Sequence, residues 1–242
     1  MPSDSQDPRI LAVIPARGGS KGVPRKNVRV VGGRPLIEWT IQTANAAVEA
    51  GVIARAVVTT DDPEIAQVAR AAGGDVPFDR PSELAGDRVP MLPVLQHALE
   101  RAEAEDGRYD WVLLLQPTNP FRTLEDIRGA IAVAAAGGCD SVIGVVRVFA
   151  VHPMLMKRIE NGVLLPWSVP EPEGTRRQDY DPPAYMRNGA IYLTRRDVLL
   201  RGSIWGETIH PFEMPEERSV GIDSELEVRL VDLLLREREG LD

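Results

Sequence analysis

The sequence predicts an α/β fold with a mostly parallel sheet, and three observations support this prediction. Apolar runs of strand length alternate with segments of helical periodicity along most of the chain. The strand-like runs are continuously apolar, as in parallel strands that helices cover on both faces. The length of 242 residues, with 43% hydrophobic and 26% charged residues, suits one globular unit, so we expect residues 1–242 to form a single domain.

The first half of the chain alternates strands and helices. "ILAVI" (10–14) and "ARAVVTT" (54–60) are predicted strands, and a helix is predicted between them over 36–50. Asp62 followed by Pro63 is typical of a helix N-cap with proline at the first helical position. Gly73 then ends that helix.

The second half continues the pattern. "MLPVLQHALERAEAE" and "TLEDIRGAIAVAAAGG" predict two helices, with Pro93 in the first turn of the former. The predicted strands are "DWVLLLQ" (110–116), "SVIGVV" (141–146) and "NGAIYLT" (188–194). The last element is an amphipathic helix over 224–239, with Leu226, Leu230, Leu233 and Leu234 expected on one side.

Residues 147–187 interrupt this alternation. The segment is rich in proline and charge, lacks periodicity, and is too long for an ordinary connection. We expect an insertion that covers the site, pairs with a partner subunit, or does both.

The overall charge and composition argue against several kinds of partner. A net charge of −8 disfavours general binding to nucleic acid or to a membrane surface, since both need a broad basic face. Cys139 is the single cysteine, so no intrachain disulfide can form, which is compatible with a reducing cytosol. The N-terminus is polar, and no run approaches the roughly 20 apolar residues of a membrane span. We therefore expect a cytoplasmic protein.

The stretch "VIPARGGSKGVPRKN" (13–27) is locally basic on this acidic chain. Directly after the first strand, Gly18 and Gly19 permit positive φ and a close approach of the backbone to a ligand. Backbone N–H groups in such a turn can bind an anion. The pattern matches neither G-x-x-x-x-G-K-[ST] nor G-x-G-x-x-G, so we expect a nucleotide loop of another type, with a solvated basic turn as the alternative. The side chains that would add a hydroxyl or charge are Ser20, Arg17, Lys21 and Lys26.

Two further stretches carry candidate polar groups. In "LLLQPTNPFR", Gln116 and Thr118 follow a strand, and the Gln116 amide could contact a base or a sugar hydroxyl. The alternative is a plain strand end with Arg122 on the surface. In "GIDSELE", Asp223 could be a helix N-cap, but Ser224 and Glu227 already form a capping-box pattern. Asp223 is therefore available as a Mg²⁺ ligand, because magnesium needs few protein ligands beside water and phosphate.

With these residues considered, the chain resembles the CMP-N-acylneuraminate (CMP-sialic acid) synthetase family, which includes cytidylyltransferases for related nonulosonic acids. The resemblance rests on "IPARGGSKGVPRKN", "RPSELAGD", "LLLQPTNPFR", "RRQ…NGAIY" and "IDSELE", and covers residues 9–238. It implies a three-layer Rossmann-like nucleotidyltransferase fold, a homodimer with residues 147–187 as its dimerisation arm, and Mg²⁺ as cofactor. It also implies transfer of CMP from CTP to an acidic sugar with release of pyrophosphate.

The resemblance also implies roles for single residues. CTP would be held by Arg17, Gly18, Gly19, Ser20, Lys21, Lys26 and Asn27, with Arg17 and Lys26 stabilising charge near the α-phosphate. The sugar acid would be contacted by Gln116, Arg177 and Asn188, with Arg177 at its carboxylate. Asp223 would bind Mg²⁺.

The chain departs from the family pattern at four places. Gly221 stands where the family often has a first aspartate, and "RVPML" replaces small hydroxyl residues after "RPSELAGD". Met186 stands where an arginine is usual, and Leu155 where a lysine is expected. Two alternatives therefore stay open: transfer with another acidic acceptor or another nucleotide, and a nucleotide-binding protein that has lost catalysis.

Overall fold

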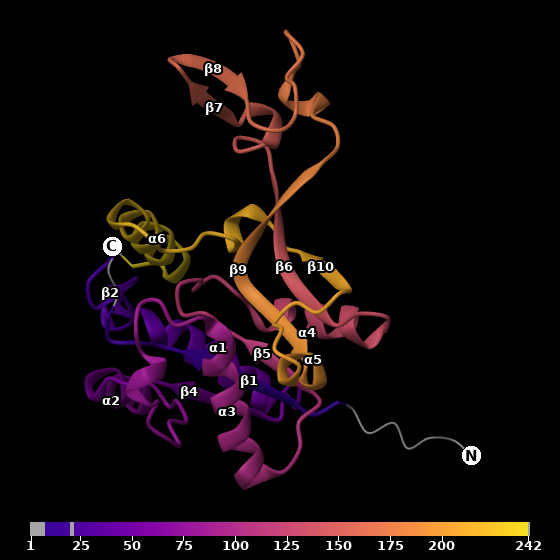
Figure 1. Ribbon diagram of the computed structural model, residues 1–242. Helices are drawn as coiled ribbons and strands as arrows, with labels where there is room; N and C mark the ends of the chain where they lie inside the picture. The colour runs from indigo at the N-terminus through magenta and orange to yellow at the C-terminus, as the bar shows by residue number, and fades with distance from the viewer. Residues whose placement is uncertain (1–7, 20–21, 242) are drawn as a thin grey trace.

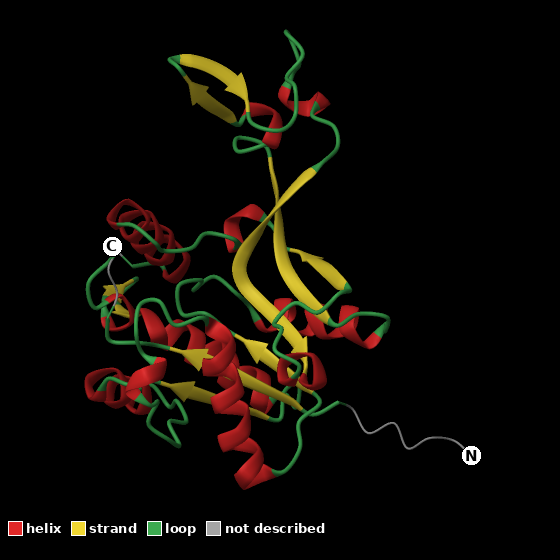
Figure 2. Ribbon diagram, viewed as in Figure 1, coloured by secondary structure: helices red, strands yellow, loops and turns green. Residues whose placement is uncertain are grey.

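The protein is built around a mixed six-stranded sheet. Its structure, a computed structural model, describes residues 8–19 and 22–241. The strand order is β10-β6-β9-β5-β1-β4 (Figures 1 and 2). Parallel pairs join β1 to β4 and β5, and β10 to β6, whereas β9 runs antiparallel between β5 and β6. The mostly parallel prediction is confirmed, with one antiparallel strand inside the sheet. The bounds are β1 Ile10–Pro15, β4 Arg55–Thr59, β5 Trp111–Leu114, β6 Ser141–Val148, β9 Ala184–Arg195 and β10 Ile209–Glu213.

Helices cover both faces of the sheet, which explains why the strands are continuously apolar. In β1, Ile10, Ala12 and Ile14 pack in one core cluster, while Leu11 and Val13 pack in a second cluster on the opposite face. The alternation of side chains along a strand separates the two sets. Helices α1 (Leu36–Glu49), α2 (Pro63–Ala71) and α4 (Leu124–Ala135) supply the first cluster, and α3 (Met91–Asp106) and α5 (Arg196–Leu200) supply the second.

Local capping sets the starts of several helices. The Asp62 side chain accepts hydrogen bonds from the backbone N–H groups of Glu64 (2.9 Å) and Ile65 (3.1 Å), and Pro63 follows it, as predicted. Thr123 and Asp126 form a capping box at the start of α4. Each cap satisfies N–H groups that have no partner within the helix.

The last helix, α6 (Glu225–Glu239), begins as predicted but presents a different face to the core. Ser224 and Glu227 form its capping box. Its buried side chains are Val228, Val231 and Leu235, which pack near the short strand β2 (Val30–Val31) and its partner β3 (Arg34–Pro35). The leucine side of the helix is not the side that packs on the core. Apolar residues at helical spacing occur on two sides of α6. The side that packs on the body is the one with Val228, Val231 and Leu235. Leu226, Leu230 and Leu233 are exposed, and Leu234 is half-buried.

Residues 149–183 form an arm that projects from the body (Figure 1). Strands β6 and β9 continue past the sheet as a two-stranded ribbon, paired from Val145↔Arg187 to Val148↔Ala184. Beyond the ribbon lies a separate hairpin of β7 (Lys157–Glu160) and β8 (Val163–Pro166). The region expected to lack periodicity therefore contains paired strands. No helix in the described part of the chain has the length and apolar character that crossing a bilayer requires.

Candidate functional site

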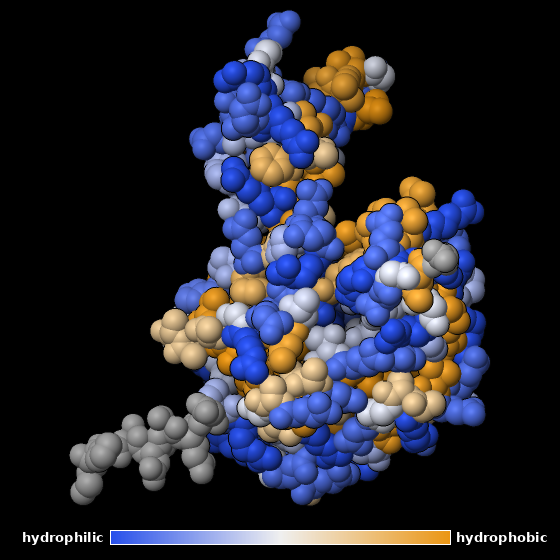
Figure 3. Space-filling view, turned by 180° about the vertical axis from the view of Figure 1, so that it is seen from behind, coloured by the Kyte–Doolittle hydropathy of each residue, from blue (hydrophilic) through white to orange (hydrophobic). Residues whose placement is uncertain are grey.

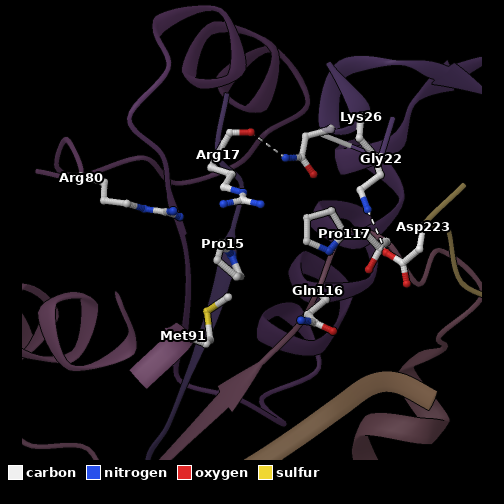
Figure 4. A pocket seen from close by; sticks show the side chains of 11 residues that line it. Pro15, Arg17, Gly22, Lys26, Arg80, Met91, Gln116, Pro117 and Asp223 are labelled. Atoms are coloured by element: carbon white, nitrogen blue, oxygen red, sulfur yellow. Dashed lines mark hydrogen bonds and ion pairs between the residues drawn. The ribbon is translucent and has the colours of Figure 1, made fainter. Parts of the chain in front are cut away.

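The carboxyl ends of β1, β4 and β5 meet at one edge of the sheet, where ligands bind in open α/β folds. Because β9 is antiparallel, its N-terminal half reaches the same edge. A cavity of about 290 Å³ opens there (Figure 4). Its lining residues are Pro15, Arg17, Gly22, Lys26, Asn27, Arg80, Met91, Gln116, Pro117, Thr118 and Asp223.

The cavity carries three cations and one carboxylate. In Figure 4, the guanidinium groups of Arg17 and Arg80 point into it from one side, and the Lys26 ammonium lies opposite, beside Asp223. Lys26 Nζ donates to the backbone oxygen of Ile222 (2.8 Å) and pairs with Asp223 Oδ1 (3.1 Å). Arg17 also pairs with Asp87 (3.1 Å), which is not among the lining residues. The described lining residues still carry an excess of positive charge, which suits a polyanion.

Arg80 is a cavity residue that sequence reasoning missed. Only 6% of it is exposed, and its guanidinium donates to the carbonyl and hydroxyl oxygens of Thr59 at the end of β4. Burial lowers the Arg80 pKa to about 10, because a partly desolvated cation is disfavoured; nearby Asp61 acts in the opposite direction. Arg80 therefore remains a cation at neutral pH. The available signal was its place in "RPSELAGD".

The opening loop uses its glycines for close packing. In this loop the positive φ falls on Arg25 (φ 55°), and Gly18 and Gly19 do not use the positive φ that glycine permits. A Cβ on Gly22 would lie 2.6 Å from the Asp223 carbonyl oxygen, and one on Gly18 would overlap the Asp62 carboxylate. Glycine at positions 18 and 22 therefore allows the loop to approach Asp62 and Asp223 closely.

Asn27 supports the loop from beneath. It is buried, and its Nδ2 donates to the Arg17 carbonyl oxygen (3.1 Å). Its amide thereby sets the backbone from which the Arg17 side chain enters the cavity. The predicted nucleotide ligands Ser20 and Lys21 lie outside the described residues.

A second cavity of about 570 Å³ adjoins the first, within the size range of small-molecule sites. The two cavities share Lys26, Gln116, Thr118 and Asp223. The second is otherwise lined by the chain after β5, by β9, and by the chain before α6 together with the first turn of that helix. These lining residues are Asn119, Met186, Arg187, Asn188, Gly189, Tyr192, Ser219, Gly221, Ile222 and Glu227.

The predicted acceptor residues are placed differently from one another. Gln116 lines both cavities. Asn188 lines the second, but its amide donates to Ser219 Oγ (3.0 Å) and accepts from the Ala190 N–H (3.0 Å). Arg177 lies over the Phe149 ring, 4.9 Å from its centre, in a third pocket at the base of the arm. That pocket shares Met186 and Ser219 with the second cavity. The arginine that the second cavity does contain is Arg187.

Arg122 is buried beneath this site, so the alternative that placed it on the surface is wrong. Its Nε donates to the Ala190 carbonyl oxygen (2.6 Å) and its Nη2 to the Gln116 carbonyl oxygen (2.9 Å). Burial lowers the pKa of Arg122, and the charge of Asp126 partly opposes the shift. The guanidinium thus joins the end of β5 to β9.

The site could accept a divalent cation with one protein carboxylate. The Asp223 side chain is 91% exposed and borders both cavities, while Ser224 caps α6 in its place. Within residues 8–19 and 22–241, no group of three or more acidic, histidine or cysteine side chains could hold a metal. A Cβ on Gly221 would lie 2.9 Å from Asn119 Nδ2, so Asn119 occupies the space next to that position. A single carboxylate is compatible with Mg²⁺, whose other ligands can be water and phosphate.

Comparisons with known proteins agree with this geometry. The family described as Cytidylyltransferase matches residues 11–214. The chain is 35% identical over 233 residues to CMP-N,N'-diacetyllegionaminic acid synthase of Legionella pneumophila, covering 94% of this chain and 96% of that protein. It is 32% identical to N-acylneuraminate cytidylyltransferase A of Danio rerio, covering 93% of this chain and 50% of that protein.

A solved structure shares the fold. CMP:2-keto-3-deoxy-manno-octonic acid synthetase complexed with CTP aligns with a TM-score of 0.72 at 21% identity, over 95% of this chain and 99% of that one. From the match over most of its length, we conclude that the chain belongs to the cytidylyltransferase family.

Proposed function

We propose that this protein transfers CMP from CTP to a nonulosonic acid of the legionaminic or sialic acid type, releasing pyrophosphate. The observation that carries the proposal is the pair of adjoining cavities. The first has the cations that a triphosphate needs, and the second has the size and polar lining that suit an acidic sugar. The residues common to both, Lys26, Gln116, Thr118 and Asp223, mark the place where the two substrates would meet.

The reaction is a displacement at phosphorus. The anomeric hydroxyl oxygen of the acid forms a bond to the α-phosphorus, the bond from that phosphorus to the bridging oxygen breaks, and the hydroxyl proton is released. The protein contributes positioning and charge neutralisation in such transfers. Arg17 and Lys26 lie on opposite sides of the first cavity, where they would neutralise charge on the phosphates, and Arg80 would add to them.

Magnesium would be held by Asp223 together with phosphate oxygens and water. When bound, it neutralises phosphate charge and favours departure of pyrophosphate. Gln116 would hydrogen-bond the acid from the boundary of the cavities. The carboxylate of the sugar acid suits the paired N–H donors of an arginine. Arg187 lines the second cavity and could supply them, and Arg177 remains a predicted partner.

We also propose that two copies pair through the arm. Its hairpin exposes Ile159, Leu164 and Trp167, each at least 64% exposed, and Figure 3 shows apolar side chains at the far end of the arm. Apolar groups exposed together are typical of interaction sites. A partner subunit would cover them, and 147–187 would serve as the dimerisation arm within a single domain.

The test is a matrix of the four nucleoside triphosphates against legionaminic acids, sialic acid and 2-keto-3-deoxy-manno-octonic acid. Pyrophosphate release is measured with and without Mg²⁺. We expect turnover that requires CTP, Mg²⁺ and a nonulosonic acid. Turnover with another triphosphate or another acid would favour the alternative transfer reaction. Binding of CTP without turnover on any acid would favour a protein that only binds nucleotide.

A further inference from the structure

Among the basic residues of the opening loop that the structure describes, Arg25 is the one that lies away from the first cavity. It is not among the described residues that line either cavity. Its guanidinium instead contacts the start of α2, where Nη1 lies 2.5 Å from Asp62 Oδ2 and Nη2 lies 3.3 Å from Asp62 Oδ1. Glu64 adds a second carboxylate to the same guanidinium.

Asp62 is itself firmly anchored. Its carboxylate caps α2 through the N–H groups of Glu64 and Ile65, and only 16% of the side chain is exposed. The hydrogen bond from Arg25 is the main cause that holds the Asp62 pKa below its ordinary value of 3.8. The Arg25 side chain is 41% exposed, so the contact depends on the two bonds to a carboxylate that is already held by the helix cap, and not on burial of the arginine.

The backbone of Arg25 connects this contact to the site. Arg25 has φ 55°, an uncommon value for a residue with a side chain. Its carbonyl oxygen accepts from the N–H groups of Val28 and Arg29 (both 3.1 Å), and so it starts the short 3-10 turn Lys26–Val28. The first residue of that turn is the cavity cation Lys26. The conformation of Arg25 therefore sets where the Lys26 side chain begins.

The other end of the loop also contacts acidic residues that follow β4, namely Asp61 and Asp62. The Gly18 N–H donates to Asp61 Oδ1 (3.3 Å), and Gly18 packs where a Cβ would overlap Asp62. Adjacent carboxylates after β4 thus contact the loop both just after Arg17 and just before Lys26.

We propose that Arg25 and Asp62 form a clamp that positions the nucleotide loop, with Arg25 acting as a positioning residue and not as a phosphate ligand. This inference rests on the proposed binding of CTP. In the clamp, the ion pair holds the left-handed turn in place before any nucleotide arrives. Lys26 and Arg17 then do not need to be ordered by the ligand, which would otherwise cost binding free energy.

A double-mutant cycle on binding tests the clamp. The variants are Arg25→Ala, Asp62→Ser and their combination. Serine keeps an N-cap at α2 but lacks the carboxylate. CTP and inorganic tripolyphosphate are titrated by calorimetry in the absence of any acceptor. Thermal unfolding confirms that each variant is folded. Arg29→Ala is the matched control, because it removes the nearby exposed pair with Glu225 (2.6 Å) outside both cavities.

For a clamp, each single variant weakens both ligands by about 3- to 10-fold, and the double variant is no weaker than the weaker-binding single. The Arg29→Ala control stays within about twofold of wild type. If Arg25 touches phosphate, Arg25→Ala weakens binding while Asp62→Ser leaves it unchanged or tightens it, which overturns the clamp. Unchanged binding in both singles, or effects that multiply in the double variant, also overturns it.

The cycle separates this inference from the proposed function. If the wild type fails to bind CTP and tripolyphosphate, both proposals fall. If the wild type binds CTP and the variants bind as tightly, the clamp alone falls.

Discussion

Arg122 gives the sharpest test of how the site is supported, because its buried cation joins two backbone segments. Arg122→Met keeps most of the side-chain volume but removes the guanidinium donor from the carbonyl oxygens of Ala190 and Gln116. The Gln116 oxygen keeps only the longer bond from the Asn119 N–H (3.3 Å). Two hydrogen bonds from a charged donor contribute about 3–6 kcal/mol. Removing a buried cation also removes its desolvation cost, so we expect a net loss near the lower end, about 3 kcal/mol in the free energy of unfolding.

Urea denaturation measures this loss directly, and the slope with denaturant shows whether unfolding stays two-state. For a chain of this size, the loss corresponds to a fall of about 6–12 °C in the unfolding temperature. The control is Arg128→Met on the exposed side of α4, which should change stability by about 0.5 kcal/mol or less. A loss below about 1 kcal/mol for Arg122→Met would refute the reasoning, since it would mean that neither carbonyl depends on the guanidinium.

Three further outcomes follow from the site and its surroundings. Lys26→Ala should lower kcat/KM by about 10²–10³-fold with the proposed substrates, while the unfolding temperature changes little. In a pyrophosphate-release assay, a loss below about tenfold would contradict the placement of Lys26 beside the α-phosphate. Asp223→Ala should abolish the Mg²⁺-dependent rate without lowering stability. Ser224→Ala should instead cost about 1 kcal/mol of stability and leave the rate unchanged, because Ser224 caps α6. The reverse pattern would make Asp223 the structural residue. Hydrogen bonding from Arg196 holds the Glu103 pKa below its ordinary value of 4.5. Glu103 therefore contributes stability above pH 4.5 that is lost as the pH falls through its folded pKa. In an acid titration of Glu103→Gln, the free energy of unfolding should fall less steeply below pH 4.5 than in the wild type.

Much of the fold could be predicted because its signals are local. The alternation of apolar strands with periodic helices predicted a covered, mostly parallel sheet. The pairs Asp62–Pro63 and Ser224–Glu227 predicted where α2 and α6 begin, since a cap acts within four residues. The basic loop after β1 predicted an anion site at the carboxyl edge for the same reason.

The sequence pattern could not predict which residues from distant segments contact one another in the folded protein. Burial of Arg80 and Arg122 depends on segments that are distant in sequence. Arg80 was therefore missed, and a surface position for Arg122 stayed open as an alternative. The exposed leucines of α6 show the same limit: two apolar sides were present, and the side that contacts the body was decided by packing.

The sequence by itself therefore determined the kind of protein: a covered α/β sheet, capped helices and, after the first strand, a basic loop whose motif belongs to one enzyme family. Only the tertiary structure decided how the charges of that loop are used. It turned Lys26 toward Asp223 at the boundary of two cavities and Arg25 toward Asp62 at the start of α2. The two side chains diverge because Arg25 has a left-handed backbone conformation and Lys26 begins the 3-10 turn that follows it. That geometry depends on contacts with β4, α2 and the chain before α6, which local sequence does not encode.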